Sequence, residues 1–279
     1  MTLRRRMTAA LKWVGAFLLF LVLTVCFIPD RLIRDGIVRS LQQEGYTVSA
    51  ERIGKAFPLG VQARDLEISD SRGLLLKAAK VRVRLSLLPL LTGKVVLGCD
   101  AVIGKGEVSG EYGIRDGAVR IDVSAIRLEE LPLIRTITGA VVNGTLAAHG
   151  SFRGKGKAAT GNLQLEVKGA NVAGLKVSGL PLPDADYPEI QGVLRAGSGT
   201  ITLTSFTLEG EGIYSRITGN MPLTVPLGAA PLNLTIELMP KPEFLEKQKF
   251  VFLLLAKYIT TPGHYEIPLR GTLSSPSIL

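Results

Sequence analysis

Alternation of apolar and polar side chains along short segments is the feature that most constrains the fold of this chain. In residues 80–85 every second residue is aliphatic, and the residues between are lysine and arginine. The same alternation recurs at residues 119–124, 163–168 and 232–238. Successive side chains of a strand point to opposite faces of its sheet. The pattern therefore predicts antiparallel strands, with one apolar face and one wet face.

The fold class that we expect is mainly β: an elongated antiparallel meander that forms a curved sheet or groove. An apolar sheet face must be covered by another sheet, a helix or a ligand. About a dozen strands at ~4.8 Å per strand would give a groove of ~60 Å. A closed sandwich with a dry core fits the alternation equally well, so both arrangements stay open. The candidate lining residues of a groove are Val81, Val83, Leu85, Leu163, Leu165 and Val167.

Glycine is abundant, with 31 residues, and it recurs in the pattern of an apolar residue, any residue and then glycine. Gly110, Gly154 and Gly219 are three of the glycines in this pattern. Because hairpin turns require the positive φ that glycine adopts easily, we expect these glycines at strand ends. The alternation slips between Leu203 and Phe206, which predicts a bulge or a change of strand.

Residues 13–28 carry no charge, and the basic residues Arg4, Arg5, Arg6 and Lys12 precede them. An uncharged run of this length after a positive cluster predicts one transmembrane helix, with a cytoplasmic N-terminus and an exported remainder. Residues 1–29 would then be a cytoplasmic basic tail and a transmembrane anchor. The aromatic residues of the anchor are Trp13, Phe17, Phe20 and Phe27.

Two other interpretations of this N-terminal segment compete with an uncleaved anchor. A cleaved signal peptide would show small residues at a cleavage site, and residues 25–30 offer none. A lipoprotein signal would place a small residue before Cys26, where Val25 stands, but a lipid-modified Cys26 stays open. The only other cysteine, Cys99, is far along the chain, so no disulfide is expected.

Beyond the anchor, the sequence predicts an amphipathic helix at residues 30–45 and a β domain at residues 46–279. Residues 128–138 suggest a short helix, and residues 180–188 a loop between two halves of the domain. A second helix is predicted at residues 242–259, with Pro242 in its first turn and Lys257 in its last. Since its centre is apolar nearly all round, we expect this helix to be buried against the sheet. A role at a membrane surface or a partner is the alternative.

Catalytic and metal-binding patterns are weak in this sequence. The only histidines, His149 and His264, fall on the polar side of a strand and in a turn. The segments Gly104-Lys105-Gly106 and Gly154-Lys155-Gly156 lack the spacing of a phosphate loop. Glu129, Glu130, Asp184 and Asp186 are carboxylates on a predicted helix and loop. We expect no enzyme activity, no catalytic residues, no metal and no cofactor. The formal charge is +9, but the sequence has no dense run of basic residues interleaved with aromatic ones. Nucleic-acid binding is therefore not expected.

Two segments resemble a known group of proteins. Phe57-Pro58-Leu59-Gly60-Val61, Asp65-Leu66-Glu67-Ile68 and the stretch from Leu74 to Tyr112 look like the start of AsmA-like periplasmic proteins. The closing segment from Leu269 to Pro276 resembles their ending. Size, the single anchor and the late apolar helix fit the short branch known as type II secretion system protein N.

This resemblance implies a single-pass inner-membrane protein of a Gram-negative bacterium, with its β domain in the periplasm. For the secretion branch it implies an accessory place beside other type II secretion components. For the wider group it implies a groove that handles phospholipid. The chain is much shorter than the large AsmA-like proteins, and the resemblance brings no catalytic residues.

Overall fold

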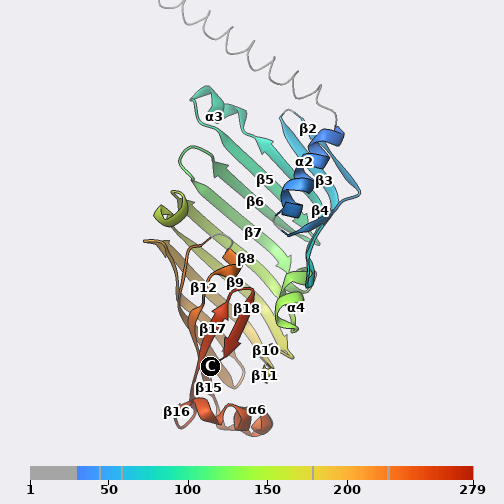
Figure 1. Ribbon diagram of the computed structural model, residues 1–279. Helices are drawn as coiled ribbons and strands as arrows, with labels where there is room; N and C mark the ends of the chain where they lie inside the picture. The colour runs from blue at the N-terminus through green and yellow to red at the C-terminus, as the bar shows by residue number, and fades with distance from the viewer. Residues whose placement is uncertain (1–29, 44, 58, 178, 225–226, 279) are drawn as a thin grey trace, which may run out of the picture.

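The computed structural model describes residues 30–43, 45–57, 59–177, 179–224 and 227–278 (Figure 1). The predicted anchor, with Trp13, Phe17, Phe20, Phe27 and Cys26, lies outside these residues. Within the described ranges, no helix is long and apolar enough to cross a membrane.

One large antiparallel sheet dominates the molecule, and its strand order follows the chain with few exceptions (Figure 1). The prediction of a mainly β antiparallel meander is therefore confirmed. The strands of the 16-stranded sheet are β1 (Thr47–Ser49), β2 (Arg52–Ala56), β3 (Gly60–Asp70), β4 (Gly73–Leu85), β5 (Val96–Ile103), β6 (Gly106–Gly113), β7 (Val119–Arg127), β8 (Val141–Arg153), β9 (Thr160–Ala173), β12 (Ala185–Gly197), β13 (Thr200–Gly210), β14 (Ile213–Pro222), β15 (Asn233–Pro240), β16 (Ile259–Thr261), β17 (His264–Thr272) and β18 (Ser275–Ile278).

A small two-stranded sheet interrupts this order. It consists of β10 (Lys176–Val177) and β11 (Leu180–Pro181). The prediction of a loop at residues 180–188 is wrong at both ends, because β11 occupies its first residues and β12 begins at Ala185. The backbone pairs that β12 forms with β9 start at this same residue, so the ladder extends further than the glycines and prolines suggested.

Short helices join or cover the strands. They are α2 (Asp30–Gln43), α3 (Leu87–Leu91), η1 (Leu128–Glu130), α4 (Pro132–Thr138), η2 (Gly156–Ala158), η3 (Leu227–Ala229), α5 (Pro242–Lys247), α6 (Lys249–Leu254) and η4 (Ala256–Tyr258). The helix predicted at residues 30–45 is present as α2, which contacts β1 and β2. The helix predicted at residues 128–138 is present as η1 followed by α4. α3 was not predicted.

The helix predicted at residues 242–259 is broken into α5, α6 and η4. Its first turn contains Pro242, as expected. The break falls at Gln248, whose φ is −117°. The side-chain amide of Gln248 donates to the backbone carbonyl of Asp184, and its oxygen accepts from the Asp184 N–H at 3.0 Å. These two bonds to the segment between β11 and β12 hold the backbone out of the helical conformation.

The largest buried cluster lies where this late segment meets the last strands. Phe252 and Leu255 are 3% and 0% exposed, and the Phe252 ring lies 5.1 Å from that of Tyr265. Phe250 and Leu253, on the same helix, are 71% and 68% exposed. The segment therefore packs against the sheet as predicted, but with one face only.

Two local predictions about the strands have different outcomes. The register between β13 and β14 shifts between Leu203 and Phe206, which confirms the expected irregularity. Gly154 lies in the β8–β9 turn with φ +96°, as expected of a turn glycine. Gly110 and Gly219 instead lie inside β6 and β14, so their placement at strand ends is wrong. The neighbouring strand explains why position 219 is a glycine, since a Cβ there would lie only 2.7 Å from the Leu234 Cα.

The buried cluster gives a direct stability prediction. Ile267 on β17 is fully buried, so the Ile267→Ala variant should lose about 2–5 kcal/mol of unfolding free energy. Leu253→Ala, at an exposed position, should change it by less than about 0.5 kcal/mol. Urea unfolding of the detergent-solubilised chain, followed by circular dichroism, measures both values. Equal stability of the two variants would contradict the position of Ile267 at the centre of the core.

Candidate functional site

The register of the sheet aligns apolar residues into rows that run across it from strand to strand. Each member of a row is the direct backbone partner of the next. The first row is Ile53, Ala63, Val81, Ala101, Val108, Val123, Ala148, Leu165, Gly192, Phe206, Ile217, Ile236 and Ile267. The second is Val61, Val83, Cys99, Gly110, Ile121, Gly150, Leu163, Leu194, Leu203, Gly219, Leu234, Leu269 and Ile278.

A third row runs beside the second from β4 to β14. Its members are Leu85, Leu97, Tyr112, Val119, Phe152, Gly161, Ala196, Ile201 and Met221. Members of neighbouring rows lie two residues apart along each strand, except at the β13 irregularity between Leu203 and Phe206, so all three rows share one side of the sheet. We call this side the apolar face.

The structure places all six predicted lining residues on the apolar face. Val81 and Leu165 belong to the first row, Val83 and Leu163 to the second, and Leu85 to the third. The sixth, Val167, pairs with Leu146 and Ile190 on the far side of the first row. The residues predicted from separate segments therefore lie on one continuous surface.

The opposite side of the sheet is polar. It carries the ion pairs Arg84–Asp100 at 3.0 Å, Arg120–Glu111 at 3.7 Å and Lys168–Glu166 at 3.2 Å. His149 Nδ1 lies 2.8 Å from Asp122 Oδ1 on this side, with 70% of the histidine side chain exposed. Exposed pairs of this kind contribute little to stability. His149 is thus a solvated surface residue, as predicted.

The apolar face has a closed part and an open part. In the closed part, Val167 and Ile190 join residues of α6, β15 and β17 in the largest buried cluster. In the open part, Val83 is 38% exposed, Tyr112 is 40% exposed and Cys99 is exposed. The face is thus covered by the protein's own elements at the late strands. At the early strands its first row packs against a second buried cluster of Ala78, Ile103 and Ile126, and its second and third rows meet solvent.

Small residues on the apolar face make room for large ones on the next strand. A Cβ on Gly192 would lie 2.7 Å from the Phe206 ring and 2.8 Å from Leu165 Cγ. A Cβ on Gly150 would lie 2.7 Å from Leu163 Cδ1. Large cross-strand side chains therefore occupy the space over these glycines. Sequence reasoning missed this role, because it treated recurrent glycine as turn punctuation.

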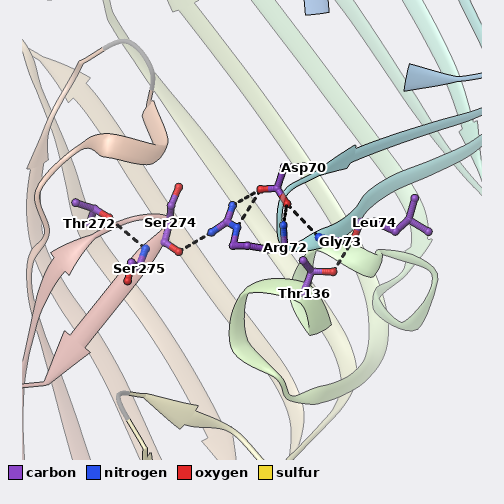
Figure 2. Close-up of polar contacts among 8 residues, drawn as sticks. All are labelled: Asp70, Arg72, Gly73, Leu74, Thr136, Thr272, Ser274 and Ser275. Atoms are coloured by element: carbon purple, nitrogen blue, oxygen red, sulfur yellow. Dashed lines mark hydrogen bonds and ion pairs between the residues drawn. The ribbon is translucent and has the colours of Figure 1, made fainter. Parts of the chain in front are cut away.

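A turn near the start of the sheet contacts a turn near its end. Arg72, in the β3–β4 turn, donates from Nη1 to the backbone carbonyl of Ser274, in the β17–β18 turn, at 2.7 Å (Figure 2). These residues are 202 positions apart. Leu131, beside α4, packs against the clusters of both the early and the late strands. The contact therefore joins two hairpins that are far apart in the strand order.

Asp70 holds the Arg72 side chain in position for this contact (Figure 2). Its Oδ2 accepts from Arg72 Nε at 2.9 Å and from Nη2 at 2.6 Å, and its Oδ1 accepts from the Arg72 backbone N–H at 2.8 Å. These bonds to Arg72 keep the pKa of the Asp70 carboxyl below its ordinary value of 3.8. On the other side of the turn, Thr136 of α4 donates to the Leu74 carbonyl at 2.6 Å. We call the contact of Asp70, Arg72 and Ser274 the latch.

The remaining sequence candidates have structural roles or solvent contacts. His264 begins β17 and lies 3.3 Å from Glu266. Glu130 accepts from the Lys105 N–H at 3.2 Å and so closes the β5–β6 turn. Partial burial and the neighbouring Asp100 carboxylate raise the pKa of the Cys99 thiol, which disfavours a reactive thiolate even though part of the residue is exposed. Among the described residues, no three His, Cys, Asp or Glu side chains are grouped so that they could hold a metal ion.

Comparison with known proteins adds no relative to these observations: no family model, curated protein or solved structure matches the chain. The apolar face and the latch are therefore the features on which a functional argument can be built.

The latch gives a prediction about local opening. The backbone N–H of Ser274 donates to the Gly228 carbonyl, and Arg72→Ala should speed the exchange of this amide hydrogen. The expected increase is roughly two- to tenfold, which corresponds to the net free energy of one hydrogen bond. The matched control is Lys77→Ala, which removes an exposed ion pair with Glu67 on the same two strands. Hydrogen-exchange mass spectrometry measures both variants. Equal protection of Ser274 in the two variants would contradict the latch.

The same contact should depend on pH. The pKa of Asp70 is lower in the folded protein than in the unfolded chain. Its contribution to the stability of the latch is therefore complete above pH 3.8, and it is lost as the pH falls through the pKa of the folded state. Protection of Ser274, corrected for intrinsic exchange, should therefore decrease below about pH 4. In Asp70→Asn this decrease should be absent, and a decrease of the same size would refute the assignment.

Proposed function

We propose that this protein is a non-enzymatic accessory component of the type II protein secretion system. Residues 13–28 anchor it in the inner membrane of a Gram-negative bacterium, and its sheet lies in the periplasm. It works by presenting the apolar face to an apolar partner, which is an exposed segment of another secretion component.

The observation that carries this proposal is the open part of the apolar face. The second and third rows of apolar side chains cross this part, and their members Val83 and Tyr112 remain more than a third exposed. Exposed apolar surface of this kind marks sites that bind a partner or a ligand. The polar side of the same strands carries exposed ion pairs, so one side of the sheet is distinguished from the other.

The type II assignment is supported by the two segments that resemble the AsmA-like group. Arg72 lies between the resembling stretches at residues 65–68 and 74–112, and Ser274 lies in the closing one; these two residues form the latch. The resembling segments, which lie at opposite ends of the chain, therefore meet in space. A shared requirement to close the sheet accounts for their occurrence together.

A second candidate function is lipid binding or transfer in the manner of the wider AsmA-like group. The length of the apolar rows favours it, since the first row alone joins residues of 13 strands, from Ile53 to Ile267. Acyl chains need only a continuous apolar surface, without directional polar contacts. In this alternative, phospholipid occupies the face that the first proposal assigns to a protein segment.

A pair of valine variants on opposite faces tests the proposal. Val83→Asp places a charge on the apolar face, and Val102→Asp places one on the polar side, where Val102 pairs with Lys80 and Glu107. In a deletion strain, Val83→Asp should lower secretion of type II substrates at least tenfold. Val102→Asp should restore secretion, because its face already carries charges.

Outcomes of this experiment separate the two functions. A deletion that leaves secretion of every type II substrate intact would refute the accessory role. Lipid mass spectrometry of the purified chain tests the alternative: stoichiometric phospholipid that is lost in Val83→Asp and kept in Val102→Asp would support it. Maleimide labelling of Cys99 reports on the same face, since any bound occupant should slow it.

A further inference from the structure

Two large apolar side chains project into solvent near the junction of β2, β3 and β4. Phe57, in the β2–β3 turn, is 85% exposed, and Leu88, in α3, is 80% exposed. They are the most exposed large apolar side chains of the described residues. Neither is explained by the apolar face, because both lie beyond the ends of its strands.

The backbone brings these two side chains to the same end of the molecule. The Leu85 N–H donates to the Leu59 carbonyl at 2.7 Å. Phe57 is two residues before one end of this bond, and Leu88 is three residues after the other. Five residues of chain reach at most about 18 Å when fully extended, and the step between paired strands adds about 5.5 Å. Phe57 and Leu88 therefore lie at the same end of the molecule, and we call the two side chains together the prominence.

The start of α2 points toward this prominence. β1 pairs with residues 67–69 of β3 and β2 with residues 60–64, so the chain from β1 to β2 advances toward Phe57. α2 lies against both strands and ends next to β1, where the Tyr46 N–H donates to the Leu41 carbonyl. Its first residue, Asp30, therefore lies toward the Phe57 end. In Figure 1, α3 and the start of α2 lie at the same upper end.

The uncharged run of the sequence comes directly before α2. The uncharged run of residues 13–28 ends two positions before Asp30. If that run crosses a bilayer, the first residue of α2 must lie within a few ångströms of the bilayer surface. The prominence of Phe57 and Leu88 then faces the same surface.

Basic side chains lie close to α3, at the same end of the molecule as the prominence. A cavity of about 920 Å³ begins just after α3 and is lined by Lys94, Arg115 and Arg153, among others. Among the described residues, no carboxylate lies within ion-pair distance of these three. The acidic residues of the cavity are Glu111, which pairs with Arg120, and Asp116. The cavity therefore has an excess of positive charge.

We propose that this end of the molecule docks on the surface of an anionic lipid bilayer. Phe57 and Leu88 enter the interface between head groups and acyl chains, and Lys94 and Arg115 bind lipid phosphates. Apolar side chains beside unpaired cations are the chemistry that such a surface recognises. The inference rests on the proposed function only for the anchor. It does not depend on what occupies the apolar face.

A fluorescent reporter on the full chain tests the docking. Cys26 and Cys99 are replaced by serine, Leu88→Cys is labelled with a polarity-sensitive NBD probe, and the chain is reconstituted into vesicles of phosphatidylcholine and phosphatidylglycerol. The control is Leu253→Cys, a leucine that is 68% exposed on α6, at the lower end of Figure 1. The probe at position 88 should emit at shorter wavelength, and lipids with a nitroxide near the head group should quench it at least twofold. The probe at position 253 should show neither change.

Each result has a defined meaning. Equal emission and quenching at positions 88 and 253, in a chain that stays with the vesicles in sodium carbonate, overturns the docking and leaves the proposed function standing. Release of the chain by carbonate overturns the anchor, and with it both proposals. Lys94→Glu with Arg115→Glu should at least halve the quenching at position 88. Unchanged quenching would overturn the role of these two cations.

Discussion

Cross-strand register is the constraint on which the rest of this structure depends. Side chains alternate along each strand, so a shift of one residue in any ladder would move apolar residues to the wet side. The ladders from β2 to β17 absorb bulges at several places and still place Ile53 and Ile267 in one row. A single sheet with two chemically distinct sides results.

The glycines of the apolar face also bear on the bend of the sheet. Side chains on the inner side of a bend are crowded, and glycines at positions such as 150 and 192 relieve this crowding by admitting Leu163 and Phe206. With the face bent, α6 and the last strands cover its late part, while its early part stays open.

Alternation was enough to predict the strands and the side on which Val81 and Leu165 lie, because that signal is local and strong. Breaks that depend on distant partners were not predictable. Gln248 interrupts the late helix because it bonds to Asp184, which is 64 residues away. Gly110 looked like a turn residue since only the neighbouring strands reveal that it belongs to a row. The latch was equally hidden, because neither Arg72 nor Ser274 is unusual in its own segment.

The latch also bears on the order in which the chain can reach its final state. Ser274 follows Arg72 by 202 positions, and the core residues Tyr265 and Ile267 are only slightly earlier than Ser274. A ribosome synthesises these residues long after the early strands that they meet have been made. Until then the early strands have no counterpart to close against, and their apolar rows are open to chaperones. A chain that lacks only its last hairpin would therefore keep nearly all of its strands and still be recognisable to quality control as unfinished.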